Sequence, residues 1–256
     1  MDMDITILGS GTSQGVPVIA CNCEVCTSVH SLDKRLRSSI HIMVDGVSIV
    51  IDTGPDFRQQ MLRENIQQLD AVLMTHSHKD HVAGLDDIRA YNFKQKKSMD
   101  IYASQACWTR LKMEYDYVFA SEKYPGVPSV NDIEIHETKS FFIQGIEIIP
   151  ILVWHYKMPV LGFRIGDFTY ITDANKIDAT EFEKIKGSKV FIINALQKTE
   201  HISHFTLSEA ISLADTVGAE QTYFTHISHK LGKHEEEDQA LPQNMNLAFD
   251  GLKIKC

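Results

Sequence analysis

The stretch that most constrains this chain is LMTHSHKDHVAG, at residues 73–84. An apolar run that predicts a buried strand (AVLMT) leads directly into three histidines and an aspartate. His76 and His78 stand two apart, so an extended segment holds them on one side, while Asp80 and His81 reach a second point if the chain curls. Imidazole nitrogens and carboxylate oxygens are ligands that zinc accepts. The loop therefore predicts two metals at one strand end, in preference to a polar loop of solvated histidines.

Ligand-type residues also stand at the ends of other predicted strands. His155 closes IIPILVWH, Asp173 closes FTYITD, and His226 closes QTYFTH. Strand ends on one edge of a sandwich converge in space, so these residues are expected to complete the coordination begun by the loop. A single aspartate at position 173 could bridge two cations.

The remaining pattern predicts one α+β domain over residues 1–256. Strand-like runs such as SSIHIMV and VSIVIDTG are joined through Asp45-Gly46, a strong hairpin signal. Both halves place strands before helices, which favours two sheets flanked by helices. The segment from about 91 to 128 is less regular. It is expected to be either a loop or helical cover over the site, or a surface insertion whose aromatic residues pack on the core.

Charge and composition limit the partners. The chain has 256 residues, 43% of them hydrophobic, and a net charge of −9. Extended nucleic acid is disfavoured because no strongly basic face is expected, whereas a small anionic substrate held by metal fits. The N-terminal apolar run is too short for a signal peptide, and no stretch approaches the length of a membrane span. We therefore expect a cytoplasmic protein without a membrane partner.

Three of the five cysteines crowd into CNCEVC. In a reducing compartment such spacing predicts metal ligands before disulfides, and three thiolates need one more ligand for tetrahedral zinc. His229 is the candidate, and three unpaired thiols are the alternative. Cys107 and Cys256 have no partners in this pattern. The cysteines in the motif are Cys21, Cys23 and Cys26.

Taken together, the H-x-H-x-D-H loop, IDTG and the downstream ligands resemble the metallo-β-lactamase superfamily. More narrowly, ILGSGTSQGVP, CNCEVC, THISH and LPQNMNLAFDGLKI resemble the phosphodiesterases that open five-membered cyclic phosphates of phosphoribose. The resemblance runs nearly end to end. It implies a four-layer αβ/βα sandwich with a dinuclear site at the edge where the two halves meet.

The resemblance also implies roles for individual residues. Two divalent cations, zinc or manganese, would share the site, and Asp52 would support the loop without being a ligand. His204, in EHISHFTL, matches a family histidine that aids phosphate binding or protonates the leaving alkoxide, with His201 as an alternative. One cation would be held by His76, His78 and His155, the other by Asp80, His81 and His226, with Asp173 bridging. A structural zinc would be held by Cys21, Cys23, Cys26 and His229.

The implied reaction is hydrolysis of a small phosphodiester, and cyclic sugar phosphates are among the candidate substrates. The nucleophile would be a hydroxide that bridges the metals, with Asp80 and His204 as catalytic residues. A tRNA 3′-processing nuclease, a thioester or lactone hydrolase, a lactamase and a non-enzymatic metal-binding scaffold remain alternatives. A di-iron oxidoreductase of this fold would be expected to carry glutamate at position 78. The loop NALQKTEHISH departs from the acidic, proline-containing version in the family, so the substrate stays open, as does association into a homodimer.

Overall fold

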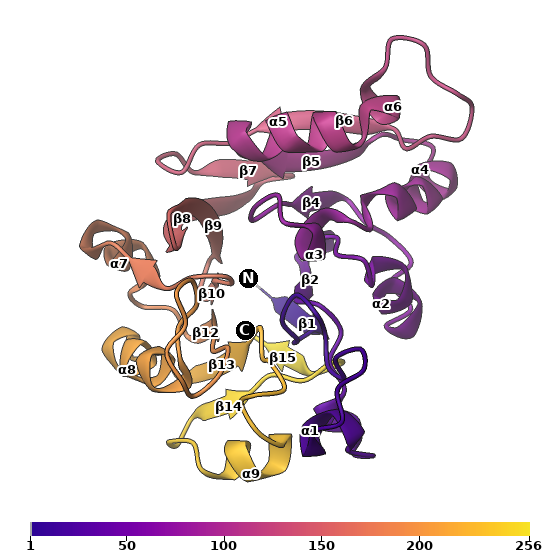
Figure 1. Cartoon of the computed structure of the whole chain (residues 1–256). Coiled ribbons are helices and arrows are strands. Elements are labelled where there is room, and N and C mark those ends of the chain that lie inside the picture. Colours follow the sequence, from indigo (N-terminus) through magenta and orange to yellow (C-terminus); the bar gives the residue numbers. More distant parts are fainter. Residues whose placement is uncertain (1) are drawn as a thin grey trace.

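The computed structural model describes residues 2–256 and contains two mixed β-sheets that face each other, with helices on their outer sides (Figure 1). The first sheet has the order β15-β1-β2-β3-β4-β5-β6. Its strands are β15 (Lys253–Lys255), β1 (Met3–Gly9), β2 (Ser39–Val44), β3 (Val47–Ile51), β4 (Ala71–Leu73), β5 (Met99–Ala103) and β6 (Val130–Glu134). None of the helices within residues 2–256 is long and apolar enough to cross a membrane.

The second sheet has the order β11-β8-β9-β10-β12-β13-β14, and β7 pairs with β8. Its strands are β7 (Phe141–Ile143), β8 (Ile146–His155), β9 (Met158–Ile165), β10 (Phe168–Tyr170), β11 (Lys176–Ile177), β12 (Val190–Asn194), β13 (Gln221–Thr225) and β14 (Met245–Leu247). The strands β10, β12, β13 and β14 run parallel, so the polar residues that follow three of them emerge at one edge.

Helices form the outer layers. On the first sheet these are α2 (Phe57–Arg63), α3 (Lys79–Val82), η2 (Leu85–Ile88), α4 (Arg89–Gln95), α5 (Gln105–Glu114) and α6 (Asp116–Phe119). On the second sheet they are α7 (Ala179–Ile185) and α8 (Leu207–Val217), and α9 (His234–Gln239) contacts β14. Two short elements, α1 (Glu24–Thr27) and η1 (Ser31–Asp33), lie in the N-terminal loop.

The alternation of side chains along each strand creates three apolar cores. On β3, Ile49 and Ile51 belong to the core between the sheets, while Val50 belongs to the core beneath the outer helices. On β12, Ile192 faces the inter-sheet core and Ile193 faces the core under α8. The period of two thus builds a sheet that is apolar on both faces. The predicted four-layer sandwich is confirmed.

The Asp45-Gly46 hairpin is also confirmed. Val44 pairs with Val47 across the turn, and the two turn residues have φ of +46° and +84°. Both central residues of a type I′ turn require positive φ, which aspartate tolerates and glycine adopts freely. The turn therefore sets the register that puts the β2 and β3 apolar residues on matching faces.

For residues 91–128 the structure bears out the packing of aromatic residues on the core, where Tyr91 and Tyr115 are buried, but it shows neither a cover nor a surface insertion. This segment supplies α5, α6 and β5, and β5 lies inside the first sheet between β4 and β6. Its aromatic residues are anchors: Tyr91 Oη donates to the carbonyl of Ile66 (2.8 Å), and Tyr115 Oη donates to that of Val82 (2.7 Å). The segment is therefore part of the sandwich. It supports the H-x-H-x-D-H loop through the contact of Tyr115 with Val82 and does not cover that loop.

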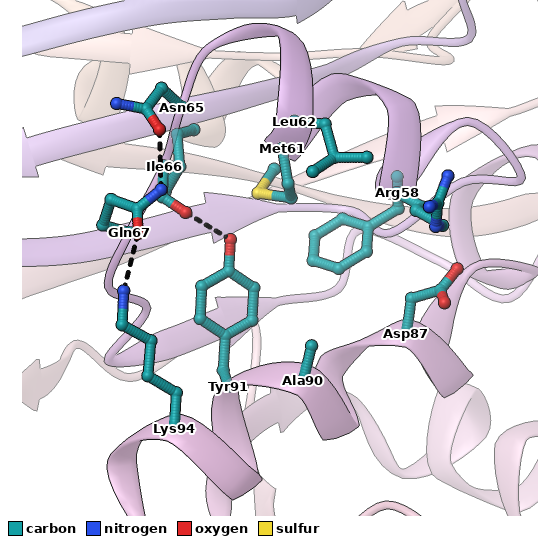
Figure 2. A pocket seen from close by; sticks show the side chains of 11 residues that line it. Arg58, Met61, Leu62, Asn65, Ile66, Gln67, Asp87, Ala90, Tyr91 and Lys94 are labelled. Carbon is teal, nitrogen blue, oxygen red and sulfur yellow. Dashed lines mark hydrogen bonds between the residues drawn. The ribbon is translucent and has the colours of Figure 1, made fainter.

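A cavity of about 270 Å³ lies between α2 and α4, on the outer side of the first sheet (Figure 2). Met61 and Tyr91 supply apolar surface. Tyr91 bonds to the carbonyl of Ile66, and Lys94 Nζ donates to Gln67 Oε1 (2.7 Å), so hydrogen bonds close one end. None of the candidate metal ligands lines this cavity.

A buried arginine links the N-terminal loop to α9. Arg35 Nη1 donates to Ser10 Oγ (2.8 Å), and Arg35 Nη2 donates to Nδ1 of His234 (2.9 Å). Burial, together with the charge of Arg35, lowers the pKa of His234 to about 4. His234 is therefore neutral in the folded protein at pH values where an exposed histidine, with a pKa near 6.5, takes up a proton.

This difference predicts a pH-dependent loss of stability. Because the unfolded chain binds this proton more readily, the free energy of unfolding should fall as the pH drops from about 6.5 towards 4. The variant His234→Asn keeps an acceptor for Arg35 but does not titrate. Between pH 7.5 and 5 it should lose less stability than the parent, by on the order of 1 kcal/mol, in urea unfolding monitored by fluorescence. Equal losses in both proteins would contradict this assignment.

Candidate metal centre

The loop after β4 is held by Asp52, which follows β3. The backbone N–H and Oγ1 of Thr75 donate to the Asp52 carboxylate (2.9 and 2.8 Å), and His81 Nδ1 donates to Asp52 Oδ2 (2.7 Å). Gly54 of IDTG permits close contact, because a Cβ there would lie 2.2 Å from the carbonyl oxygen of Asp80. The IDTG motif therefore fixes the position of the loop.

Hydrogen bonds also fix the tautomers of three histidines. His76 Nδ1 lies 3.0 Å from Oγ1 of Thr75, whose proton goes to Asp52, so His76 is the donor. His155 Nδ1 donates to the carbonyl of Ser203 (2.9 Å). His81 likewise donates from Nδ1 to Asp52. In all three rings Nδ1 therefore carries the proton, and the lone pair of Nε2 points away from the Nδ1 hydrogen bond. Such outer hydrogen bonds are the usual way in which a protein orients histidine ligands for a metal.

The other side chains converge on Asp173, which follows β10. His226 Nδ1 lies 2.8 Å from Asp173 Oδ1. The Nε2 atoms of His81, His76 and His204 lie 3.4, 3.6 and 3.6 Å from Asp173 Oδ2. We call the following eight residues the Asp173 cluster. They are His76, His78, Asp80, His81, His155, Asp173, His204 and His226.

Three residues of this region adopt left-handed backbone conformations. Asp52, Asp173 and His226 have φ of +64°, +52° and +56°. Each stands just after a strand, where the turn of the chain brings its side chain back over the sheet edge. Such conformations are uncommon for residues with a Cβ and concentrate at functional sites.

The ligand atoms fall into three overlapping groups whose members lie within 4.8 Å of one another. Asp80, His81, Asp173 and His226 form one group, as the resemblance implies. His76 and His78 form a second group with Asp173. His155, however, groups with Asp173 and His204, and its ring centroid lies 5.2 Å from that of His78. The resemblance implies that His155 shares a cation with His76 and His78, and the structure matches this grouping only in part.

Unpaired ring nitrogens provide the test of whether a metal fits. Among residues 2–256, four buried histidine nitrogens of the Asp173 cluster have no partner in hydrogen-bonding geometry, although Nδ1 of His226 lies 2.8 Å from Asp173 Oδ1 and Nε2 of His81 lies 3.1 Å from Asp80 Oδ2. Buried polar atoms in proteins are nearly always paired, so such a group at one point requires an explanation. A cation would satisfy all of them together. The atoms are Nε2 of His76, Nε2 of His81, Nε2 of His204 and Nδ1 of His226.

The electrostatics favour the same conclusion. Burial disfavours a charge on His81, yet the carboxylates of Asp173, Asp52 and Asp80 overcome it and raise the pKa of His81 well above its usual range. A surrounding that stabilises an imidazolium ion also stabilises a divalent cation. Burial raises the pKa of Asp173, but the charges of His226 and His81 prevail and hold it well below its usual range. The residues of the Asp173 cluster therefore fit metal ions.

His204 lies at the margin of the cluster, in the loop before α8. Its Nδ1 contacts Ser203 Oγ and His201 Nδ1, both at 3.1 Å. Burial lowers the pKa of His204 to about 4, so the ring is neutral near pH 7. A neutral ring donates one hydrogen bond, and an anion bound beside it would favour protonation of the ring.

A hydroxyl of the N-terminal glycine-rich stretch also contacts the cluster. Thr12 Oγ1 lies 3.2 Å from His226 Nε2, and the Thr12 N–H donates to the carbonyl of Ile227 (3.0 Å). Thr12 belongs to the glycine-rich stretch GSGTSQG, far from His226 in sequence. Only the folded chain brings the two together.

The cysteine motif forms a second, separate group. The Sγ atoms of Cys21, Cys23 and Cys26 lie 3.3, 3.3 and 3.4 Å from Nδ1 of His229. A tetrahedral zinc with Zn–S near 2.3 Å and Zn–N near 2.0 Å would separate sulfur and nitrogen by about 3.5 Å. The Cys26 N–H lowers the pKa of Cys23 to about 6, which favours its thiolate. These four residues, the cysteine cluster, therefore fit zinc.

Comparison with known proteins agrees with this geometry. Residues 48–227 match the family described as Beta-lactamase superfamily domain. A crystal structure of a diphosphatase from the PhnP family is 39% identical, with a TM-score of 0.94, and covers 100% of this chain and 98% of that one. The zinc-bound PqqB from Methylobacterium extorquens, 20% identical over 98% of this chain and 99% of that one, shares the fold with a TM-score of 0.79.

One curated relative is longer than this chain. An octanoyltransferase from Porphyromonas gingivalis (strain ATCC BAA-308 / W83) is 38% identical over 253 residues, which are 98% of this chain and 51% of that protein. This chain thus spans about half the length of that relative. The fold, the Asp173 cluster and these matches define the chain as a protein of the metallo-β-lactamase fold with residues that fit metal ions. It belongs to the metallo-β-lactamase superfamily and, within it, to the PhnP family.

The cysteine cluster yields a stability prediction. Cys23→Ser should remove one zinc per chain and lower Tm by roughly 5–10 °C, because losing about 2–3 kcal/mol shifts Tm by about 2–4 °C per kcal/mol in a chain of this size. Cys256→Ser, outside the cluster, is the matched control. Elemental analysis and calorimetry provide the readouts. Unchanged zinc content and Tm in Cys23→Ser would show that the cluster holds no structural metal.

Proposed function

We propose that the protein is a dinuclear metal-dependent phosphodiesterase that hydrolyses a small phosphodiester, with cyclic sugar phosphates among its substrates. The convergence of unpaired histidine nitrogens on Asp173 carries this proposal. Zinc or manganese would occupy the two sites, and the cysteine cluster would hold a structural zinc. His76, His78 and His155 would hold one cation, and Asp80, His81 and His226 the other, with Asp173 between them.

When bound, the cations would lower the pKa of a water towards neutrality and neutralise phosphate oxygens of the substrate. The protein side chains would do the rest. Burial raises the pKa of Asp80, but His81 outweighs it and holds that pKa far below its usual range. Asp80 therefore stays ionised and can accept a hydrogen bond from the attacking water. His204 would contact the phosphate and give a proton to the leaving oxygen.

Size and charge favour a small substrate. A phosphodiester with one or two phosphates binds without a broad basic surface, which suits a chain of net charge −9. The relative with 39% identity is named a diphosphatase, which supports phosphate chemistry. A transfer-RNA precursor would need more cationic surface than this chain offers.

An acyl ester is the second candidate. The octanoyltransferase relative is named for an acyl group, and a dinuclear site can also polarise a carbonyl. A screen of metal-loaded protein against bis-p-nitrophenyl phosphate, a ribose cyclic phosphate, an octanoyl thioester and a lactam separates the two. We expect turnover of the phosphodiesters. Efficient acyl cleavage without phosphodiester cleavage would overturn the proposal.

Asp173 should be required for turnover but not for folding. Asp173→Asn keeps the side-chain size and removes the charge between the two cations, so hydrolysis of bis-p-nitrophenyl phosphate should fall by about 10²-fold or more. Metal content should drop while the zinc of the cysteine cluster stays. Asp167→Asn, at an exposed carboxylate paired with Lys189, is the control. A variant with normal metal content and turnover would exclude Asp173 as a ligand.

The role of His204 can be resolved with two leaving groups. If it is the general acid, His204→Ala should lower turnover of an alkyl phosphodiester by about 10²- to 10⁴-fold. The loss should be smaller on p-nitrophenyl esters, because p-nitrophenolate leaves without a proton. His136→Ala, on the surface, is the control. An equal loss on both esters would assign His204 to phosphate binding, and no loss would remove it from the mechanism.

A further inference from the structure

A cavity of about 470 Å³ opens directly beside the Asp173 cluster. It is lined by His78 and His155 and also by Tyr156, Met158 and Ile202, and we call these last three the apolar wall. Tyr156 and Ile202 are 51% and 66% exposed. Large apolar side chains therefore meet solvent within the same cavity as two candidate metal ligands.

This apolar wall is held in place by hydrogen bonds. The Tyr156 N–H donates to Asn175 Oδ1 (2.8 Å), and Asn175 Nδ2 donates to the carbonyl of Ile202 (3.0 Å). The Asn175 N–H itself donates to the carbonyl of Trp154 (2.9 Å). Asn175 follows Asp173 by two positions, so one short segment positions both the cluster and the wall.

The backbone of Tyr156 is strained. It has a φ of +58°, in the turn between β8 and β9, where glycine or asparagine is the usual occupant. The ring is half exposed, so its packing does not explain why the turn carries an aromatic residue. The turn requires this backbone conformation but not an aromatic side chain, and strained residues are enriched at functional sites.

A second, polar cavity also borders the cluster. It has a volume of about 200 Å³, and His204 lines it together with hydroxyl, amide and ammonium groups, among them Thr12, Ser13, Gln197 and Lys230. Beside the first cavity, Lys157 Nζ lies over one face of the Tyr156 ring, 5.1 Å from its centroid. A ligand that extends from one cavity to the other would thus meet an aromatic ring and a cation in the first and hydrogen-bonding groups in the second.

We propose that Tyr156 stacks on the nucleobase of the substrate, so that the protein acts on a nucleotide-containing phosphodiester or diphosphate. The proposal rests on the proposed phosphodiesterase function. Every base offers a π-face to an aromatic side chain, and Lys157 beside the ring suits an anionic nucleotide. Tyr156 is then a specificity residue, which acts on the choice of substrate and not on the scission itself.

Two esters with one leaving group test this. Thymidine 5′-(p-nitrophenyl phosphate) carries a base, and ethyl p-nitrophenyl phosphate does not. The parent protein should prefer the first in kcat/KM, and Tyr156→Asn, which suits the left-handed backbone, should reduce that preference by about 5- to 150-fold, the effect of losing one base–aromatic stack. Tyr156→Phe should retain it. Tyr124→Asn, at an exposed tyrosine in the loop after α6, is the matched control.

A parent protein without this preference, or an equal loss on both esters in Tyr156→Asn, would overturn the inference. Calorimetric titration of metal-loaded protein with AMP and with inorganic phosphate tests base stacking by Tyr156 independently of the proposed phosphodiesterase activity. Tyr156→Asn should weaken AMP binding and leave phosphate binding nearly as it was, even if no phosphodiester is cleaved. Tighter binding of octyl phosphate than of AMP would assign the wall to an acyl chain instead.

Discussion

The negative charge of Asp173, buried among imidazoles, is the constraint on which this structure depends. An isolated carboxylate in such a place is costly, and it is accepted only where positive charge surrounds it. The rings of His226 and His81 lie beside it, but several ring nitrogens still lack a partner in hydrogen-bonding geometry. The folded chain is thus arranged around positive charge that a metal ion can supply, and the surrounding elements keep the ligands from relaxing into ordinary hydrogen bonds.

The sandwich supplies this arrangement through its strand ends. The parallel strands β10, β12 and β13 end at one edge, and the loop after β4 reaches the same place from the other sheet. Hydrogen bonds from neighbouring residues then orient the candidate ligands. Asp52 orients His81, and Thr12 orients His226. The rigid sheets carry the geometry, and the short loops carry the chemistry.

Much of this was predictable because it depends on local pattern. Asp45-Gly46 fixes a hairpin by its own backbone preferences, and ligand-type residues at strand ends identify the edge where a site forms. For the segment from 91 to 128, the packing of aromatic residues on the core was predictable, but the place of β5 inside the first sheet was not, because it depends on pairing with other strands. The grouping of His155 with His204, and the clamp of Asn175 on the Tyr156 wall, depend on how separate loops meet in three dimensions. The metal and catalytic roles themselves stay predictions.

The pairing of β1 with β15 has a consequence for how the molecule is made. Thr6 lies opposite Lys253, and the carboxylate of Asp250 accepts bonds from the N–H and Oγ of Ser10. Strand β1 and the loop that carries Thr12 therefore obtain these partners only when residues 250–255 have been synthesised. Contacts so distant in sequence form late and slowly. A ribosome-bound chain would already present the histidines of the H-x-H-x-D-H loop, yet it would lack the neighbours that orient His226 until residues 250–255 have left the ribosome.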